Sequence, residues 1–561
     1  MKDGKEQPMT RINLPAERQV EHLTLLRQGR QISTKEYNAL TSGERLEMIR
    51  QAYGKKKYDL LLNASDAEQL TPQLHPQELY MTINELGSEY SAELLMLASS
   101  EQITTLLDLD CWDGDTVSPV LSLHWIQLLL ETGPDKVCQL VREIEPEILA
   151  IFLKKHLVIT RGLEVYDDDD AENARRLESL YDIDFATDDA AKIIGAFLKI
   201  IMEQAQQSYL LIMEMIRSEI MASLEEEVFQ GRNSRLADLG FAPPAEAKNI
   251  YSFISPEDFI PGGKSDYRLE ADELQNPGAL LVQASPKSLL AEVLTNGLNH
   301  ELATELCMLA NRKMSADNTD ISSASEVGKS LQEIYDTLNL AMEHQVGTDI
   351  DEAERLVDST YLLQLFQLGH SLLQQLQNKA RELLVGPIGP YLDYPEQLFL
   401  DALLENPPVL YCEATANEPS SLQSICTSNA LERTKLRLLQ IGDLQRLFDK
   451  LPFALPNPET ETELPSLSML FLTAIANRIL GRAFSPEPLT AEDLLLLKAQ
   501  TMENEEVSAE FRRQVQSVPE KLDISCQIFI DFCLACWQED LQILDLDNLD
   551  AEDQLCLLLS S

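Results

Sequence analysis

The stretch that decides the fold is SPVLSLHWIQLLLETGPDKVCQLVREIEPEILAIFLKKHL (residues 118–157). Three prolines in it, Pro119, Pro134 and Pro146, each precede a run rich in apolar residues. Proline is tolerated in the first turn of a helix, because that position has no intrahelical N–H bond to lose. Each proline therefore predicts the start of a helix, and Ser118 is a suitable capping residue for the first of them.

The apolar residues after these prolines recur at helical spacing. Val137, Val141 and Ile144 form one stripe, and HPQELYMTINEL (75–86) repeats the same pattern of a proline followed by apolar residues at helical spacing. Recurrence at intervals of three and four residues places one apolar stripe on each helix. Helices this short cannot bury a stripe alone, so they must stack on their neighbours. Residues 75–158 therefore predict short amphipathic helices in a superhelical, solenoid-like array.

The rest of the chain predicts longer helices and very few strands. Helical patterns cover residues 188–230, 328–345, 351–384, 428–450 and 521–541. Alternating patterns are scarce, and RGLEVYDDDD (161–170) with LYDIDF (180–185) predicts at most a small hairpin. We predict an all-α fold, with the longer helices in the C-terminal half.

Changes in composition divide the chain into six segments. They are a basic N-terminal helical arm (1–57), a superhelical short-helix domain (58–165), an acidic segment with long helices (166–245), a Pro/Gly-rich linker (246–290), a helical domain (291–450) and a C-terminal helical domain (451–561). The boundaries fall at polar stretches rich in proline and glycine, which interrupt helical patterns.

The chain is strongly acidic, with a formal net charge of -48 over 561 residues. Residues 1–57 carry twelve Lys and Arg against seven Asp and Glu, so their net charge is +5 and the remainder carries -53. The electrostatic field of so negative a chain repels nucleic-acid backbones and anionic lipid, and it attracts basic proteins or divalent cations. We expect a basic protein partner and no nucleic acid. The basic segment either folds back onto the acidic body or reaches out to an anionic partner.

The chain has no predicted membrane segment. A span needs about 18 to 20 apolar residues, and the apolar run IFIDFCLACW (528–537) is short and contains Asp531. The start, MKDGKEQPMTRINLP (1–15), lacks the apolar centre of a signal peptide. Nine scattered cysteines do not resemble a disulfide framework and suit a reducing compartment. We therefore expect a cytoplasmic protein without membrane insertion.

The acidic stretch LDLDCWDGDTVSP (107–119) has two interpretations. It is not an EF-hand loop, because Gly114 at the sixth position would put Val120 at the twelfth, where a bidentate glutamate is required. In the first interpretation Gly114 turns a corner between helices. In the second, Asp113 and Asp115 hold a magnesium or calcium ion weakly, with water completing the shell.

The segment FQGRNSRLADLGF (229–241) holds two isolated cations, Arg232 and Arg235, in an acidic chain. The guanidinium fork suits carboxylates. In the structural interpretation these arginines pair with the glutamates of the preceding SLEEEVF (223–229). In the functional interpretation they form an interaction or ligand-binding patch.

The remaining motifs do not predict chemistry. PGGKS (261–265) ends like a phosphate-binding loop, but Asp258 stands where the first glycine is required. Cys526, Cys533 and Cys536 share one helix face, and apolar packing is favoured over a zinc site because no second cysteine pair is present. No catalytic residue and no cofactor is predicted.

Two stretches carry a resemblance. Residues 91–159 and FQGRNSRLADLGFAPPAEAKNIYSFISP (229–256) resemble a family of large bacterial helical proteins that is classed only as a domain of unknown function. This implies a relationship along the full length and no particular activity. Residues 75–158 are more remotely similar to the N-terminal superhelical domain of MgtE-type magnesium transporters and to the middle domain of flagellar motor switch proteins. Transport itself is not implied, because the membrane segment is missing.

Three hypotheses for the function follow. The first is a non-enzymatic cytoplasmic scaffold or protein-interaction module, whose acidic surface recruits a basic partner or a partner helix. The second is a regulatory protein that responds to a divalent cation such as magnesium through Asp113 and Asp115. The third is an enzyme of unrecognised type that uses Arg232 or Arg235. The oligomeric state is not indicated by the sequence.

Overall fold

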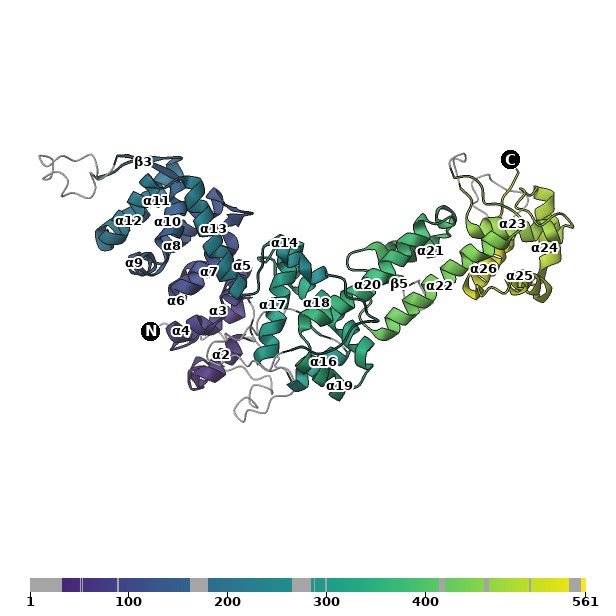
Figure 1. Cartoon of the computed structure of the whole chain (residues 1–561), viewed down its shortest axis with the longest axis horizontal. Helices are drawn as coiled ribbons and strands as arrows, with labels where there is room; N and C mark the ends of the chain where they lie inside the picture. The colour runs from purple at the N-terminus through teal and green to yellow at the C-terminus, as the bar shows by residue number, and fades with distance from the viewer. Residues whose placement is uncertain are drawn as a thin grey trace, which may run out of the picture. The chain divides into compact units, whose positions relative to one another are not determined.

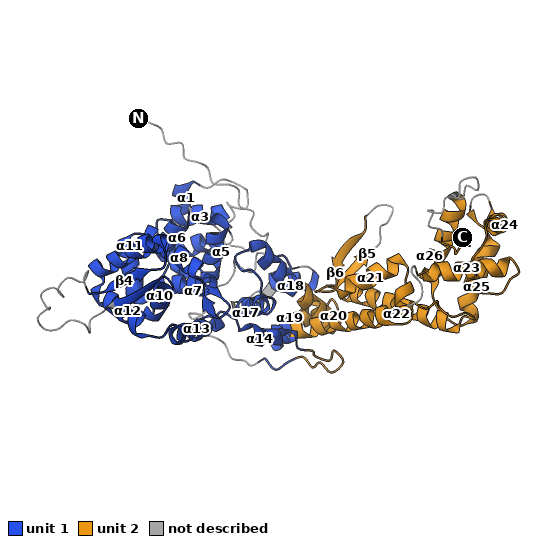
Figure 2. Ribbon diagram, turned by 90° about the horizontal axis from the view of Figure 1, so that it is seen from above, with its two compact units in different colours: residues 1–252, 262–335, 354–364 blue, residues 253–261, 336–353, 365–561 orange. Residues whose placement is uncertain are grey.

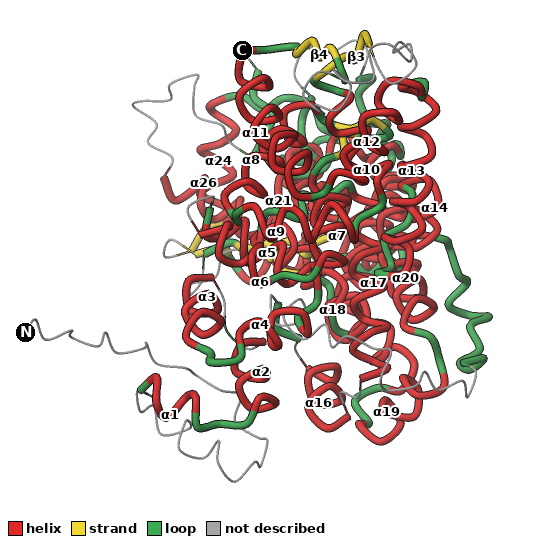
Figure 3. Tube along the Cα trace, turned by 90° about the vertical axis from the view of Figure 1, so that its left-hand side faces the viewer, coloured by secondary structure: helices red, strands yellow, loops and turns green. Residues whose placement is uncertain are grey.

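The protein is mostly helical, which confirms the predicted fold class (Figure 3). The computed structural model describes residues 33–560 apart from 51, 53, 88–89, 162–179, 265–283, 287, 298–299, 413–418, 459–463, 504–505 and 544–555. In this described part, strands form only two-stranded antiparallel sheets. No described helix combines the length and the apolar composition that a membrane crossing requires.

The chain divides into two compact units (Figure 2). Unit 1 comprises residues 1–252, 262–335 and 354–364, and unit 2 comprises residues 253–261, 336–353 and 365–561. The division passes through helices α18 (Ala324–Val346), α19 (Ile350–Ser359) and α20 (Leu362–Val385), which contribute residues to both units.

Unit 1 is built mainly from short helices (Figure 1). Its other elements are α1 (Thr34–Asn38), α2 (Ser42–Arg50), α3 (Gly54–Asn63), α4 (Ala67–Leu70), η2 (Thr71–Gln73), α5 (Pro76–Leu86), α6 (Ser91–Leu97), α7 (Ser100–Asp110), β1 (Trp112–Asp113), β2 (Thr116–Val117), α8 (Pro119–Glu131), α9 (Pro134–Glu143), α10 (Pro146–Lys154), β3 (Leu157–Arg161), β4 (Asp182–Phe185), α11 (Asp188–Gln204), α12 (Gln206–Ser218), α13 (Met221–Asp238), α14 (Pro244–Ala247), η7 (Lys248–Tyr251), α16 (Ser288–Gly297) and α17 (His300–Asp317).

Unit 2 combines longer helices with two hairpins (Figure 1). Its other elements are η9 (Gly389–Tyr391), α21 (Tyr394–Leu404), β5 (Val409–Cys412), β6 (Ser421–Ser424), α22 (Ser428–Lys450), α23 (Leu467–Ile479), α24 (Ala491–Thr501), β7 (Met502–Glu503), β8 (Glu506–Val507), α25 (Ala509–Lys521) and α26 (Gln527–Ile543). In its core the Trp537 ring stacks on Phe511, with 4.5 Å between ring centroids. Cys526 and Cys533 are buried in the same core, which agrees with the packing interpretation of these cysteines.

The four helices of unit 1 that were predicted to begin at a proline do so. Helices α5, α8, α9 and α10 start at Pro76, Pro119, Pro134 and Pro146. The hydroxyl of Ser118 accepts a hydrogen bond from a backbone N–H in the first turn of α8, so this residue is the expected cap. The starts of these helices are therefore confirmed, and their stacking as a superhelix stays a prediction.

Two of the predicted long helices are broken. Residues 188–230 form α11, α12 and the first part of α13, because the backbone leaves helical geometry at Ala205 and again at Ile220. Residues 351–384 form α19 and α20, which are separated after Ser359. None of these three breaks contains a proline or a glycine, so the usual interruption signals are missing from the sequence.

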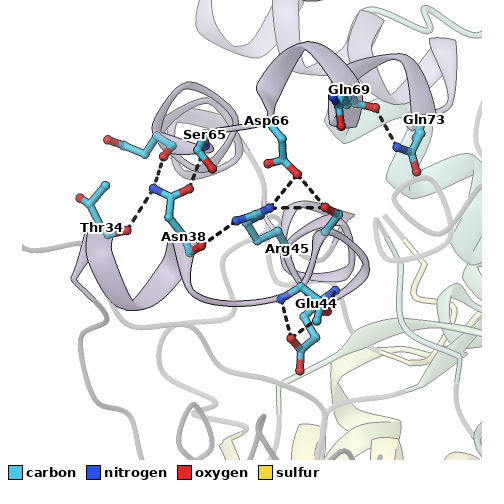
Figure 4. A network of polar contacts seen from close by, with 11 residues as sticks. Thr34, Asn38, Glu44, Arg45, Ser65, Asp66, Gln69 and Gln73 are labelled. Carbon is cyan, nitrogen blue, oxygen red and sulfur yellow. Dashed lines mark hydrogen bonds and ion pairs between the residues drawn. The ribbon is translucent and has the colours of Figure 1, made fainter.

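The described part of the basic arm packs onto the rest of unit 1 (Figure 4). The Asn38 side chain donates to the Asn63 carbonyl at 2.8 Å and accepts from the Ser65 N–H at 2.8 Å. Arg45 forms a largely buried ion pair with Asp66, with 2.6 Å between Nη2 and Oδ2. Helices α1 and α2 are therefore held against the chain between α3 and α4.

One apolar core of unit 1 takes side chains from Tyr37 to Val228, so it draws on three of the segments that composition suggested. Lys57, at the end of the predicted arm, is buried, and its ammonium donates to the buried carboxylate of Glu78. Residues 33–57 thus contribute to the body of unit 1, whereas residues 1–32 lie outside the described part.

The end of α13 brings α17 into close contact. The Phe241 N–H donates to the Leu236 carbonyl at 3.0 Å and the Gly240 N–H donates to the Ala237 carbonyl at 2.9 Å, the pattern of a Schellman cap. Gly240 has φ +88°, and a Cβ there would lie 2.5 Å from Cα of Met308 in α17. Glycine is therefore required for the turn and for the approach of α17.

A buried amide fixes the same helix one turn further along, at Asn311. Asn311 of α17 donates to the Leu239 carbonyl at 2.7 Å and accepts from the Gln77 side chain at 2.9 Å. Asn311 and Gln77 are almost completely buried. Helices α5, α13 and α17 are thus joined by directional contacts as well as by packing.

Gly240→Ala should destabilise unit 1 by about 3 kcal/mol, because a left-handed backbone and a steric clash both add cost. The matched control is Gly114→Ala, which has φ +64° but no atom within 4 Å of the new Cβ. The control should lose about 1 kcal/mol. Urea denaturation followed by tryptophan fluorescence measures both losses. Equal losses for the two variants would show that the approach of α17 does not depend on Gly240.

Candidate functional site

The stretch 107–119 forms a corner, and its aspartates separate into two pairs. Strands β1 and β2 make a hairpin in which Gly114 adopts φ +64°. Asp113 and Asp115 are exposed at its tip. Within the described ranges, no group of three or more His, Cys, Asp or Glu side chains is placed to hold a metal ion. A magnesium site at Asp113 and Asp115 therefore stays a prediction without a third protein ligand.

The other two aspartates point into the protein. Asp110 accepts hydrogen bonds from the Tyr80 hydroxyl at 2.7 Å and from the Trp125 indole at 2.6 Å. Asp108 is 1% exposed and lies against α13. The inward pair is therefore structural, and it connects α7 to three other helices of unit 1.

Asp108 holds the two arginines that the sequence singled out. Arg235 binds its carboxylate in a fork, with Nε to Oδ2 at 2.7 Å and Nη2 to Oδ1 at 2.9 Å. Arg232 donates to the Asp108 carbonyl at 2.7 Å and lies over the Trp112 ring at 5.4 Å. Arg235 also donates to the exposed carboxylate of Glu145, at 3.0 Å. The acidic corner and the arginine segment, far apart in the chain, therefore form one site.

The prediction that these arginines pair with the glutamates of residues 223–229 was wrong. The glutamates of residues 223–229 lie on α13 itself, at spacings that do not place them beside Arg232 or Arg235 on the helix surface. Glu225 pairs with Lys155 at 2.6 Å instead. An ion pair with the arginines does exist, but its carboxylates come from α7 and from the connection before α10.

Burial governs the charge at Asp108. It raises the pKa of this carboxyl, and the hydrogen bonds and positive charge of Arg235 act in the opposite direction. The fork satisfies both carboxylate oxygens, which is the arrangement that a buried carboxylate needs. Arg235 is therefore held in a fixed position at the surface of unit 1.

Beside Arg235 lies a cleft of about 470 Å³, which we name the acidic cleft. Its walls come from the start of α5, the first turns of α7, the α9–α10 connection, the end of α13 and the middle of α17. Four carboxylates line it, from Glu101, Glu143, Glu145 and Asp238, against the single guanidinium of Arg235. Since Arg235 is already paired with Asp108, the cleft carries a net negative charge.

The four carboxylates differ in their partners. Glu143 accepts hydrogen bonds from the Ser100 hydroxyl and the Gln139 amide, and Glu145 accepts from Arg235. Glu101 and Asp238 are exposed, and neither has a side-chain partner among the residues that the structure describes. Asp238 is also the last residue of α13, where the negative end of the helix dipole disfavours a carboxylate. Local conflicts of this kind are expected at functional positions.

One buried histidine of the cleft was missed by the sequence patterns. His75 is 9% exposed, caps α5 and accepts the Gln77 N–H on Nδ1 at 3.3 Å. Burial lowers its pKa to about 4, so the ring is neutral near pH 7. Since Nδ1 is an acceptor, the proton of the neutral ring resides on Nε2. No residue in the described part of the chain takes a hydrogen bond from Nε2.

A sequence signal for the missed residues does exist. His75 and Glu145 each stand immediately before the proline that opens a helix, at the capping position of α5 and of α10. The same prolines that predict helix starts therefore also mark the N-cap residues immediately before those helices. The contribution of α17 has no such signal, because it depends on contacts between distant parts of the chain.

The remaining motifs have structural partners or lie outside the described residues. Lys264 of PGGKS (261–265) pairs with Glu305 of α17 at 2.6 Å, so its ammonium is held by a carboxylate. The acidic run at 166–173 falls in a part of the chain that is not described. Of the predicted hairpin, β4 (Asp182–Phe185) lies in the expected second strand, but it pairs with β3 (Leu157–Arg161), which ends where the expected first strand (161–170) begins. Residues 162–170 lie outside the described part.

Residues 34–560 match the model of a family of unknown function (DUF6178). This range covers nearly the whole chain, so the protein belongs to that family. No curated protein and no solved structure matches the chain. The similarity of residues 75–158 to the MgtE-type transporter domain stays a prediction.

Arg235→Met should destabilise unit 1 by roughly 3 to 5 kcal/mol at pH 8, because it leaves a buried carboxylate without its partner. In the variant the pKa of Asp108 in the folded state lies above that of an unfolded carboxyl, so the folded state binds more protons than the unfolded state does. The contribution of Asp108 to stability is then present at low pH and is lost as the pH rises through its pKa in the folded state. The loss relative to wild type should therefore be smaller at pH 5 than at pH 8, as measured by urea denaturation.

The double variant Asp108→Asn with Arg235→Met serves as the control. It removes the buried charge together with its partner, so most of the stability at pH 8 should return. A loss in Arg235→Met that is the same at both pH values would mean that Asp108 is not the group left uncompensated.

Proposed function

We propose that this protein is a non-enzymatic interaction module whose unit 1 binds a basic segment of a protein partner in the acidic cleft. The observation that carries the proposal is the excess of carboxylates around the cleft, of which only Glu145 pairs with a cation among the described residues. A lysine or arginine side chain of a partner supplies that cation. Its aliphatic stem would pack on the apolar part of the wall, which includes Ile144 and Met308.

The charge of the whole chain supports the same partner. At a net charge of -48, the field attracts basic proteins, speeds their association and repels nucleic acids. A reducing, cytoplasmic compartment suits this role, because all nine cysteines are free thiols. Binding should weaken as salt rises, since the attraction is screened.

The spread of the carboxylates favours an organic cation over a metal ion. A magnesium ion needs oxygen ligands about 2.1 Å away in octahedral geometry. The acidic groups of the cleft come from separate walls, and no metal-holding group occurs in the described ranges. A basic peptide can span such a distribution, because each of its side chains can reach a different carboxylate.

The test is the binding of a fluorescein-labelled peptide of alternating arginine and glycine, with three arginines, to the full-length protein by fluorescence anisotropy. The double variant Glu101→Gln with Asp238→Asn should weaken binding about tenfold, or ~1.4 kcal/mol. Both residues are exposed and have no partner among the described residues, so folding should be unaffected.

The matched control is Asp113→Asn with Asp115→Asn, which changes the net charge equally at the exposed hairpin. The control should weaken binding less than about twofold, because exposed charges away from the site are screened. Equal effects of the two double variants would show that the peptide responds to total charge and not to the cleft, which would refute the proposal.

A further inference from the structure

The donor on His75 distinguishes between the cations that could enter the acidic cleft. The ring is more than nine-tenths buried, and its Nδ1 accepts a hydrogen bond inside α5. Its other polar atom, Nε2, carries a proton and has no hydrogen-bond partner among the described residues. Nε2 is not one of the fully buried atoms that lack a partner, so water reaches it at the edge of the cleft that His75 lines. A ligand that covers the cleft removes this water, so a ligand that brings an acceptor is favoured over one that leaves the donor unpaired.

A metal ion or a free amine brings no such acceptor. Each is a cation without an acceptor atom of its own, and the Nε2–H group would face positive charge. A peptide brings a main-chain carbonyl next to every basic side chain. The combination of carboxylates with one buried neutral donor is therefore complementary to a peptide that carries a basic residue.

We propose that His75 donates from Nε2 to a main-chain carbonyl of the bound segment, so that the acidic cleft recognises a basic residue within a peptide chain and discriminates against free cations. This inference rests on the proposed function, because it concerns the same cleft and the same class of partner. In this inference His75 determines the specificity of the cleft, and the carboxylates attract the positive charge of the ligand.

The test compares two competitors that displace the labelled arginine–glycine peptide from the full-length protein. One is the acetylated and amidated tripeptide glycine–arginine–glycine, and the other is butylguanidinium, which has a guanidinium on an alkyl stem and the same single positive charge but no carbonyl. The tripeptide should displace the label at about fivefold lower concentration than butylguanidinium, which corresponds to one net hydrogen bond.

The variant His75→Asn separates this role from the capping of α5. Asparagine is a good N-cap residue, so α5 keeps its cap while the Nε2 donor is removed. In this variant the advantage of the tripeptide should fall to about one, and displacement by butylguanidinium should be unchanged. His75→Ser is a second capping variant for the case that the first does not fold, as judged by its thermal unfolding.

The outcomes separate this inference from the proposed function. Equal displacement by both competitors on wild type, or an advantage of the tripeptide that persists in His75→Asn, would overturn the role of His75 while binding of basic ligands stands. If the labelled peptide does not bind the wild-type protein at all, the proposed function fails and this inference fails with it.

Discussion

The ion pair between Asp108 and Arg235 is the contact on which the acidic cleft depends. The carboxylate is buried and bound in a fork, so α13 has one position against α7. That position places Asp238 at the edge of the cleft, and the turn at Gly240 then brings α17 in as a further wall. Because a buried carboxylate is costly without its partner, other arrangements of these helices are disfavoured. The pair thus acts more as a positioning device than as a source of stability.

The residues that could be recognised in the sequence are those whose effect is local. Pro76 and Pro146 act on the helix that they open, and Arg232 and Arg235 stand out because cations are rare in this chain. The partner of Arg235 could not be recognised, since Asp108 lies 127 residues earlier and is one of 93 acidic residues. The donor at His75 was hidden for the same reason, because burial in the cleft arises only from tertiary packing.

Two kinds of contact act in the acidic cleft. The carboxylates attract cations and speed their association, and this attraction is screened by salt. The neutral donor of His75 supplies selectivity, because a hydrogen bond distinguishes ligands that have an acceptor from those that do not. The low pKa of His75, about 4, keeps this donor neutral across the physiological range. An acidic protein can in this way attract many kinds of cation and still bind selectively those that bring a hydrogen-bond acceptor.

The most direct test of peptide binding in the acidic cleft is a crystal structure of the full-length protein with the three-arginine peptide. We expect one guanidinium among the carboxylates of Glu101, Glu143 and Asp238, and a main-chain carbonyl within hydrogen-bond distance of Nε2 of His75. The ion pair between Asp108 and Arg235 should be retained in the complex. A peptide that lies on another face of the protein while the cleft is empty would contradict both the site and the mode of recognition.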